Sequence, residues 1–194
     1  MPRRSKSDLG FERDPRRKRE IKGRPFADAV YRDFWGPQTL AMRTDTTLPM
    51  FLDREYGIDV QLSVAKGMKV TGQEKFLSFA GGDTVTVELF DDPKKGQPGD
   101  WFRMIPQFYF VAYFNDDESG FRSWIMLDWA GTIEATVKGH VSWKRRKNQD
   151  GRAKADFVFC PFAEFPSYVV FDRFPPPGVL PEFDTIEQTT WWQT

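Results

Sequence analysis

The sequence predicts a mixed α/β fold, in which a few short helices pack against a sheet that holds both parallel and antiparallel strands. Two observations support this prediction. Three strand-like segments follow one another closely between residues 58 and 90, and this spacing favours an antiparallel meander. A fourth strand-like run, residues 108–114, comes after a short helical segment, so the chain crosses over before this strand joins the sheet.

A single domain with two extended termini accounts for the 194 residues. With 40% hydrophobic and 16% aromatic residues, the chain can bury a substantial core. Residues 1–24 lack hydrophobic periodicity and predict a flexible arm, residues 25–174 form the domain, and residues 175–194 predict an irregular, proline-rich tail. No apolar run reaches the roughly 20 residues of a membrane span, and no apolar signal segment stands at the N-terminus. We therefore expect a cytoplasmic protein without a membrane partner.

Two helices are expected before the strands. Residues 25–35 carry a proline in the first turn and stop at a Gly-Pro pair, both typical of helix ends. Residues 48–56 form the second helix, with Thr46 or Thr47 as its N-terminal cap and Gly57 as its C-terminal cap.

The three consecutive strands are expected at residues 58–64, 68–79 and 84–90. A Lys-Gly pair separates the first two, and Gly72 predicts a bend or bulge in the second. Later we expect, in order, a short helix at 101–107, the buried strand 108–114, a strand at 124–129, a helix that begins within 133–137, a polar loop at 144–151 and a strand at 155–162.

The chain contains too few cysteine and histidine residues for a disulfide, a zinc site or a protease active site. Cys160 is the single cysteine and lies in an apolar run, so we expect a small buried side chain rather than a disulfide or a nucleophile. His140 has no second histidine and no cysteine nearby, so neither a zinc site nor the chemistry of serine or cysteine proteases is expected.

Charge is unevenly distributed, although the net charge is zero. The first 24 residues contain ten basic and four acidic side chains, and a second basic cluster follows Trp143, which could stack on a base. A basic arm on an acidic body is seen in proteins that bind nucleic acid, and a solvated tail without a partner is the alternative. The residues expected to contact phosphates are Arg16, Arg17, Lys18, Arg19, Lys144, Arg145, Arg146 and Lys147.

Candidate catalytic residues gather on the first two strands. Side chains alternate along a strand, so Gln73 and Lys75 share one face and Glu74 takes the other, unless a bulge shifts the register. If the strands pair, Asp59 lies beside Gln73 and Lys75. Oxygen ligands such as Asp59 and Gln73 suit Mg²⁺ or Mn²⁺, which would activate water against a phosphodiester, while a lysine offsets the developing negative charge.

These residues resemble the motif of the PD-(D/E)xK nucleases, whose core runs helix, three strands, helix, strand. Asp59 matches the first acid of the motif, Lys75 its lysine and Glu55 its helix acid. Gln73 departs from the usual Glu or Asp and is similar to the Gln-x-Lys variant of Mrr-like restriction endonucleases. Gln107 falls where related nucleases carry a glutamine on the second helix. The chain also resembles uncharacterised phage-encoded proteins.

The resemblance implies a restriction-endonuclease-like core and a Mg²⁺-dependent nuclease, for which an endonuclease acting on DNA is favoured, while RNA as the substrate and exonuclease action stay open. Two other readings stay open: a non-catalytic nucleic-acid-binding protein in which Gln73 marks lost metal affinity, and a phage structural or host-interaction protein. Asp59 and Lys75 could also form a plain surface ion pair. Glu88 could supply a further acid or could simply be solvated. The sequence does not decide whether the chain forms a homodimer.

Overall fold

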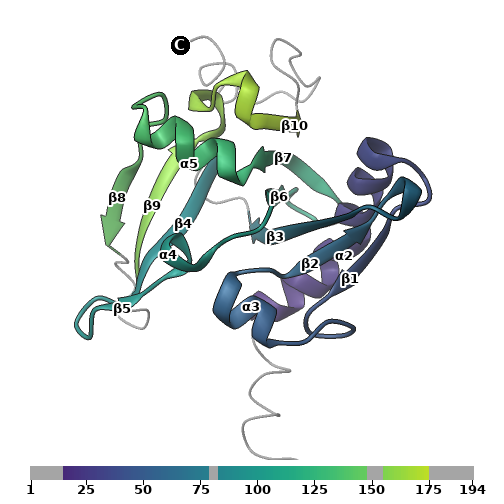
Figure 1. Ribbon diagram of the computed structural model, residues 1–194, viewed down its shortest axis with the longest axis horizontal. Helices are drawn as coiled ribbons and strands as arrows, with labels where there is room; N and C mark the ends of the chain where they lie inside the picture. Colours follow the sequence, from purple (N-terminus) through teal and green to yellow (C-terminus); the bar gives the residue numbers. More distant parts are fainter. Residues whose placement is uncertain (1–14, 79–82, 148–154, 175–194) are drawn as a thin grey trace, which may run out of the picture.

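The computed structural model describes residues 15–78, 83–147 and 155–174 (Figure 1). In chain order the elements are α2 (Pro15–Trp35), β1 (Leu40–Arg43), α3 (Phe51–Tyr56), β2 (Val60–Ser63), the 3-10 turn η1 (Ala65–Gly67), β3 (Lys69–Ser78), β4 (Thr84–Asp92), β5 (Gln97–Pro98), α4 (Asp100–Arg103), β6 (Phe108–Phe114), β7 (Phe121–Asp128), α5 (Trp129–Val137), β8 (Lys144–Lys147), β9 (Asp156–Pro161), the 3-10 turns η2 (Phe162–Glu164) and η3 (Ser167–Val169), and β10 (Val170–Phe174). None of the helices in these ranges is long and apolar enough to cross a membrane.

The larger sheet has six strands in the order β1-β2-β3-β6-β7-β10. All neighbours are antiparallel except β3 and β6, which run parallel, so the predicted mixed sheet is confirmed. Every residue of β6 is buried, as expected for the central strand of a sheet covered on both faces. The pairing of β2 with β3 ends at Val60 and Gly72, and in the described chain no strand continues it beside Gln73–Ser78.

The smaller sheet has four antiparallel strands in the order β5-β4-β9-β8. The prediction that residues 84–90 complete the meander was wrong, because this segment is β4 and pairs with β9. The third strand of the meander is instead β1 (Leu40–Arg43), which comes before β2 in the chain and pairs with it. β1 was not predicted, since its four residues include none of the β-branched or aromatic side chains that favour strands.

Helix α2 starts at Pro15, so residues 15–24 are helical where a flexible arm was expected. Tertiary contacts hold this part: Arg17 and Arg24 bind Asp45, and Lys22 binds Glu118. Residues 15–24 of the helix are mostly polar, so no hydrophobic periodicity marks this half in the sequence. Residues 1–14 of the arm and the whole tail, 175–194, lie outside the described residues.

Three smaller expectations also differ. β3 has no bulge at Gly72, because its register is continuous with both β2 and β6. Residues 144–147 form β8 rather than part of a polar loop, since they pair along β9. The N-terminal cap of α3 is Met50, without a side-chain bond, whereas the left-handed C-terminal cap at Gly57 was predicted correctly.

Two apolar cores lie on the two faces of the six-stranded sheet. On one face α2 covers the sheet through Ala27 and Tyr31. On the other face β4, β9 and α5 pack against β6 and β7, with Val85, Val158 and Ala135 among the buried residues. Figure 1 shows the smaller sheet beside this face, with α3 and α4 at its lower end. Cys160 lies in the second core, where burial raises its pKa to about 12, as expected of an inert thiol.

Gly72 is required by the close approach of Phe108 from β6. A Cβ atom at this position would lie 2.1 Å from the Phe108 ring, and that ring is fully buried. We expect Gly72→Ala to lower the free energy of unfolding by about 2–3 kcal/mol, because an overpacked core must shift to accommodate the methyl group. Gly120→Ala is the matched control, since no atom lies within 4 Å of its added Cβ. Urea unfolding checks both variants, and equal stability would contradict the close contact.

Candidate functional site

A cleft of about 1120 Å³ runs between the two sheets and along the part of β3 that β2 leaves uncovered. Three predicted site residues, Asp59, Gln73 and Lys75, line it together. They meet there for the reason expected from the sequence. The Asp59 N–H donates to the Gly72 carbonyl at 3.0 Å, which sets Asp59 beside Gln73, and alternation along β3 places Gln73 and Lys75 on one face.

Asp59 shares the cleft with a second carboxyl group, Asp53 of α3, to which it is hydrogen-bonded. Burial and the nearby charges of Asp53 and Glu74 raise the pKa of Asp59 well above its usual range. Burial likewise raises the pKa of Asp53. The backbone N–H of Glu74 donates to Asp59 Oδ2 at 3.2 Å and fixes its orientation. The Asp53 and Asp59 carboxyl groups are thus close together, and such a pair can bind a proton or a cation.

Gln73 adds a carbonyl oxygen to the lining of the same cleft. Its Oε1 atom is buried and has no hydrogen-bond partner among the described residues. An amide oxygen that is removed from water without a partner costs roughly 1–3 kcal/mol, so such atoms are rare in folded proteins and call for an explanation.

Lys75 reaches across the cleft from β3 to β4. Its Nζ donates to the Thr86 carbonyl oxygen at 3.0 Å, and that oxygen also accepts from the Tyr109 hydroxyl at 2.8 Å. Glu88, two residues further along β4, lines the cleft on the same face as Thr86. The ammonium group therefore lies between the two sheets.

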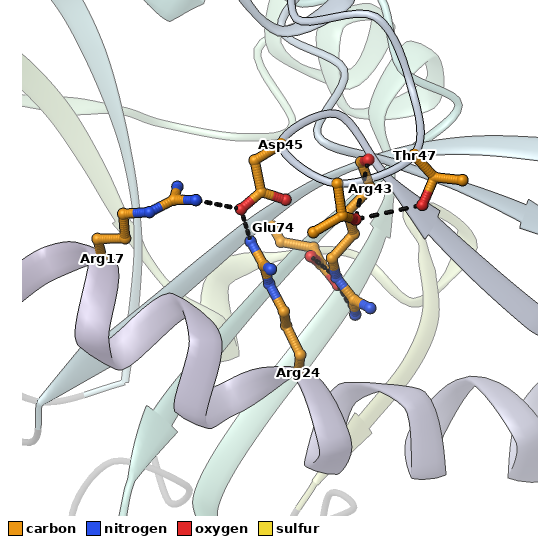
Figure 2. A network of polar contacts seen from close by, with 7 residues as sticks. Arg17, Arg24, Arg43, Asp45, Thr47 and Glu74 are labelled. Carbon is orange, nitrogen blue, oxygen red and sulfur yellow. Dashed lines mark hydrogen bonds and ion pairs between the residues drawn. The ribbon is translucent and has the colours of Figure 1, made fainter. Parts of the chain in front are cut away.

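Glu74 faces α2, as expected for a continuous β3. Arg43 donates to both of its carboxylate oxygens at 2.8 Å (Figure 2). The Tyr31 hydroxyl donates to Oε1 at 2.9 Å. Arg43 also binds Asp28 at 2.7 Å. Burial acts to lower the pKa of Arg43, but the hydrogen bonds and charge of Glu74 outweigh it and raise that pKa. This buried network fixes the strand that carries Gln73 and Lys75.

Some of the basic residues predicted to bind phosphates line the cleft, and others lie outside it. Arg17 and Arg19 of α2 and Arg146 of β8 line the cleft. Lys18 is exposed outside its lining, Lys144 lies 3.8 Å from Glu164, and Arg145 binds Asp156 at 2.6 Å. The side chains of Arg16 and Lys147 are outside the described part.

Glu55 and Gln107 do not join the site. Glu55 is exposed on α3, two residues after Asp53, and helical geometry turns the two side chains to opposite sides. Gln107 is exposed after the end of α4, and its Oε1 accepts from the Thr71 N–H at 2.9 Å, next to the start of β6. Gln107 is thus not on a helix, and it caps the β3–β6 pairing.

Several residues of the cleft were not found from the sequence, namely Asp53, Arg24, Asp100, Phe157 and Phe159. Asp53 lies on the side of α3 that faces the cleft. Its position on the helix just before Asp59 is the feature that could have identified it. No local pattern marks the two phenylalanines, because they reach the cleft only through the pairing of β9 with β4.

Comparison with known proteins adds no relative. No protein-family model matches the chain, and no curated protein and no solved structure matches it significantly. The assignment of the cleft therefore rests on its own chemistry.

Asp45 joins the N-terminal half of α2 to the loop after β1, through Arg17 at 2.8 Å and Arg24 at 2.6 Å (Figure 2). Burial acts to raise the pKa of Asp45, but the hydrogen bonds and charges of Arg24 and Arg17 outweigh it and lower that pKa. A carboxyl pKa that is lower in the folded state stabilises the fold above the unfolded value, near 3.9, and this stability is lost as the pH falls through the folded value.

We therefore expect Asp45→Asn to cost about 1–2 kcal/mol of folding stability at pH 7 and little at pH 2. Urea unfolding at both pH values measures the difference. Asp33→Asn is the matched control, because Asp33 is an exposed carboxylate on α2, the helix that Asp45 binds. An Asp45→Asn effect that is equal at both pH values would contradict the ion-pair account.

Proposed function

We propose that this protein is a metal-dependent nuclease that hydrolyses DNA phosphodiester bonds. The observation that carries the proposal is the buried Gln73 Oε1 atom, which lacks a hydrogen-bond partner in the described chain and lies in the cleft that Asp53 and Asp59 also line. A divalent cation would satisfy this oxygen and offset the charge of the two carboxyl groups. Lys75 lines the same cleft.

The order of elements supports a nuclease-like core. When α3, β4 and β5, which lie between them in the chain, are left aside, the elements α2, β1, β2, β3, α4 and β6 follow the order helix, three strands, helix, strand. Asp59 directly precedes β2, and Gln73 and Lys75 lie on β3. The PD-(D/E)xK resemblance implies an acid on one strand and Gln-x-Lys on the next, and β2 and β3 are consecutive strands; the third strand, β1, precedes them instead of following them.

Asp59, Asp53 and the Gln73 carbonyl oxygen are the groups that would hold the metal. Among the described residues no cluster of three or more His, Cys, Asp or Glu side chains could do so, so the site needs the amide oxygen and water as well. Mg²⁺ accepts such a set, because it keeps several waters and often uses only one or two carboxylates. When bound, the metal polarises the phosphodiester and lowers the pKa of an attacking water.

The remaining groups contact the substrate or position the groups that do. The Lys75 ammonium offsets negative charge that develops on the phosphate, and its bond to the Thr86 carbonyl holds it in position. The Glu74 amide keeps Asp59 aimed into the cleft. Arg19 and Arg146, at two sides of the cleft, are placed to contact the phosphate backbone.

The first test is cleavage by Lys75→Met, which removes the ammonium and keeps most of the side-chain stem. We expect the rate on DNA with Mg²⁺ or Mn²⁺ to fall by about 100-fold or more, because a preorganised charge at the phosphate is lost. Lys69→Met on the same strand is the control, since Lys69 is exposed and outside the cleft. Gel assays on supercoiled and linear DNA measure the rates, and a fully active Lys75→Met would remove Lys75 from the reaction.

The second test is a calorimetric metal titration, which needs no substrate. Gln73→Glu should bind Mn²⁺ more tightly than wild type, because a charged oxygen replaces a neutral one. Asp59→Asn should abolish binding and Asp53→Asn should weaken it, whereas Glu55→Gln, on the exposed side of α3, should change nothing. Negligible binding by all of these proteins would mean that no metal site exists here.

A non-catalytic nucleic-acid-binding protein is the second candidate. The neutral Gln73 and the absence, among the described residues, of a three-acid cluster favour it. The two tests separate the candidates, because this second function predicts nucleic-acid binding without metal binding or cleavage.

A further inference from the structure

The smaller sheet presents one face to the cleft. Along β4 and β9 alternate side chains, such as Val87 and Val158, enter the apolar core. The intervening ones line the cleft and are Thr84, Thr86, Glu88, Phe157 and Phe159. One wall of the cleft is therefore the open face of a sheet, with two aromatic side chains on the strand β9.

Phe157 and Phe159 differ from most aromatic residues of this protein. Both are half-buried in the cleft wall, and neither stacks on another aromatic ring of the described chain. Trp143, expected from the sequence to stack on a base, is instead packed against Trp101 and Phe165 and donates to Thr136. Among the aromatic residues that line the described part of the cleft, Phe157 and Phe159 are thus the two whose rings pack on no other ring.

Basic side chains flank the two rings. In the register of β8 and β9, Arg146 pairs with Phe157 and Lys144 pairs with Phe159. Residues paired across strands point to the same face, so Phe157 has Arg146 as its direct neighbour. The Lys144 ammonium lies 3.8 Å from Glu164 instead, outside the cleft lining. The α2 side of the cleft adds Arg19. Of the acidic lining residues, Asp45, Glu74 and Asp100 are each bound by an arginine, which offsets their charge.

We propose that this wall binds single-stranded nucleic acid, with successive bases stacked on Phe159 and Phe157 and the backbone against Arg146 and Arg19. The inference rests on the proposed nuclease function, because it names the substrate class of the same cleft. An aromatic surface flanked by basic side chains is the combination that holds unpaired strands without regard to sequence. A duplex hides its base faces inside the helical stack and cannot use the two rings.

The wall lies next to the proposed catalytic groups. Phe159 pairs with Thr86 of β4, whose carbonyl oxygen accepts from Lys75. Phe159 and Lys75 therefore both lie beside Thr86, Phe159 on the paired strand and Lys75 on β3. In this arrangement Phe157 and Phe159 stack on the bases, and the phosphodiester faces the catalytic groups on β3.

Binding in EDTA tests this inference without cleavage. Fluorescence anisotropy with labelled oligo-dT, oligo-rU and a DNA duplex of equal length gives the affinities, and the two single strands compare DNA with RNA. We expect wild type to prefer single strands over the duplex, and Phe159→Leu to lose about tenfold in single-strand affinity. Leucine keeps the apolar bulk that the fold needs but has no ring face. Phe157→Leu should behave alike, and the double variant should lose more.

Two controls separate stacking from folding. Phe159→Tyr keeps a ring and should retain single-strand affinity, whereas Phe171→Leu removes an exposed ring on β10, outside the cleft, and should change nothing. Tighter binding of the duplex, or unchanged affinity of both leucine variants, would overturn the inference. Cleavage of duplex DNA alongside such a result would leave the nuclease proposal standing. Single-strand binding that needs the two rings, without cleavage in any metal, would support the inference and count against the nuclease.

Discussion

The parallel pairing of β3 with β6 is the constraint on which the rest of the structure depends. It fills one edge of β3 along Gly72–Ser78, and β2 covers the other edge only as far as Gly72. The uncovered part of β3 is where Gln73 and Lys75 lie and where the cleft opens. Gly72 marks the boundary, because only a residue without a side chain admits Phe108 at that point. A glycine that the sequence marked as a bulge thus sets the end of a sheet edge.

The two faces of β3 have separate tasks. Glu74, on the face toward α2, is bound by Arg43 and Tyr31 in a buried network that holds the strand. The opposite face carries the groups assigned to metal and phosphate. The two faces still interact, since the Glu74 carboxylate adds to the negative field that raises the pKa of Asp59. An ion pair with Arg43 keeps that field smaller than an unpaired Glu74 would produce.

Local patterns in the sequence were sufficient for much of the fold. The aromatic run of β6, the glycine cap of α3 and the alternation of β4 were all recognised, because each depends on residues that are near in the chain. The partner of β4 was not recognised, since pairing with β9 spans about 70 residues and no short pattern encodes it. The helical residues 15–24 were missed for a related reason: distant partners, Asp45 and Glu118, hold them in place.

The candidate site follows the same division. Asp59, Gln73 and Lys75 were predicted to converge because two paired strands and side-chain alternation suffice to bring them together. Asp53 requires the orientation of a helix, and the aromatic wall requires a second sheet. The sequence assigned the helix acid to Glu55, which fits the family pattern by position, although the structure directs Asp53 into the cleft instead.

The bond between Lys75 and the Thr86 carbonyl has a consequence for affinity. A lysine side chain in solution samples many rotamers, and confining it removes up to about 2 kcal/mol of conformational entropy. Here the chain folds with the lysine stem already extended across the cleft, so that entropy is lost during folding rather than during ligand binding. A ligand that meets the ammonium gains its attraction with little further ordering of the side chain. Rigidity in this one residue therefore favours tight binding by a cleft whose neighbouring carboxylates repel an anion.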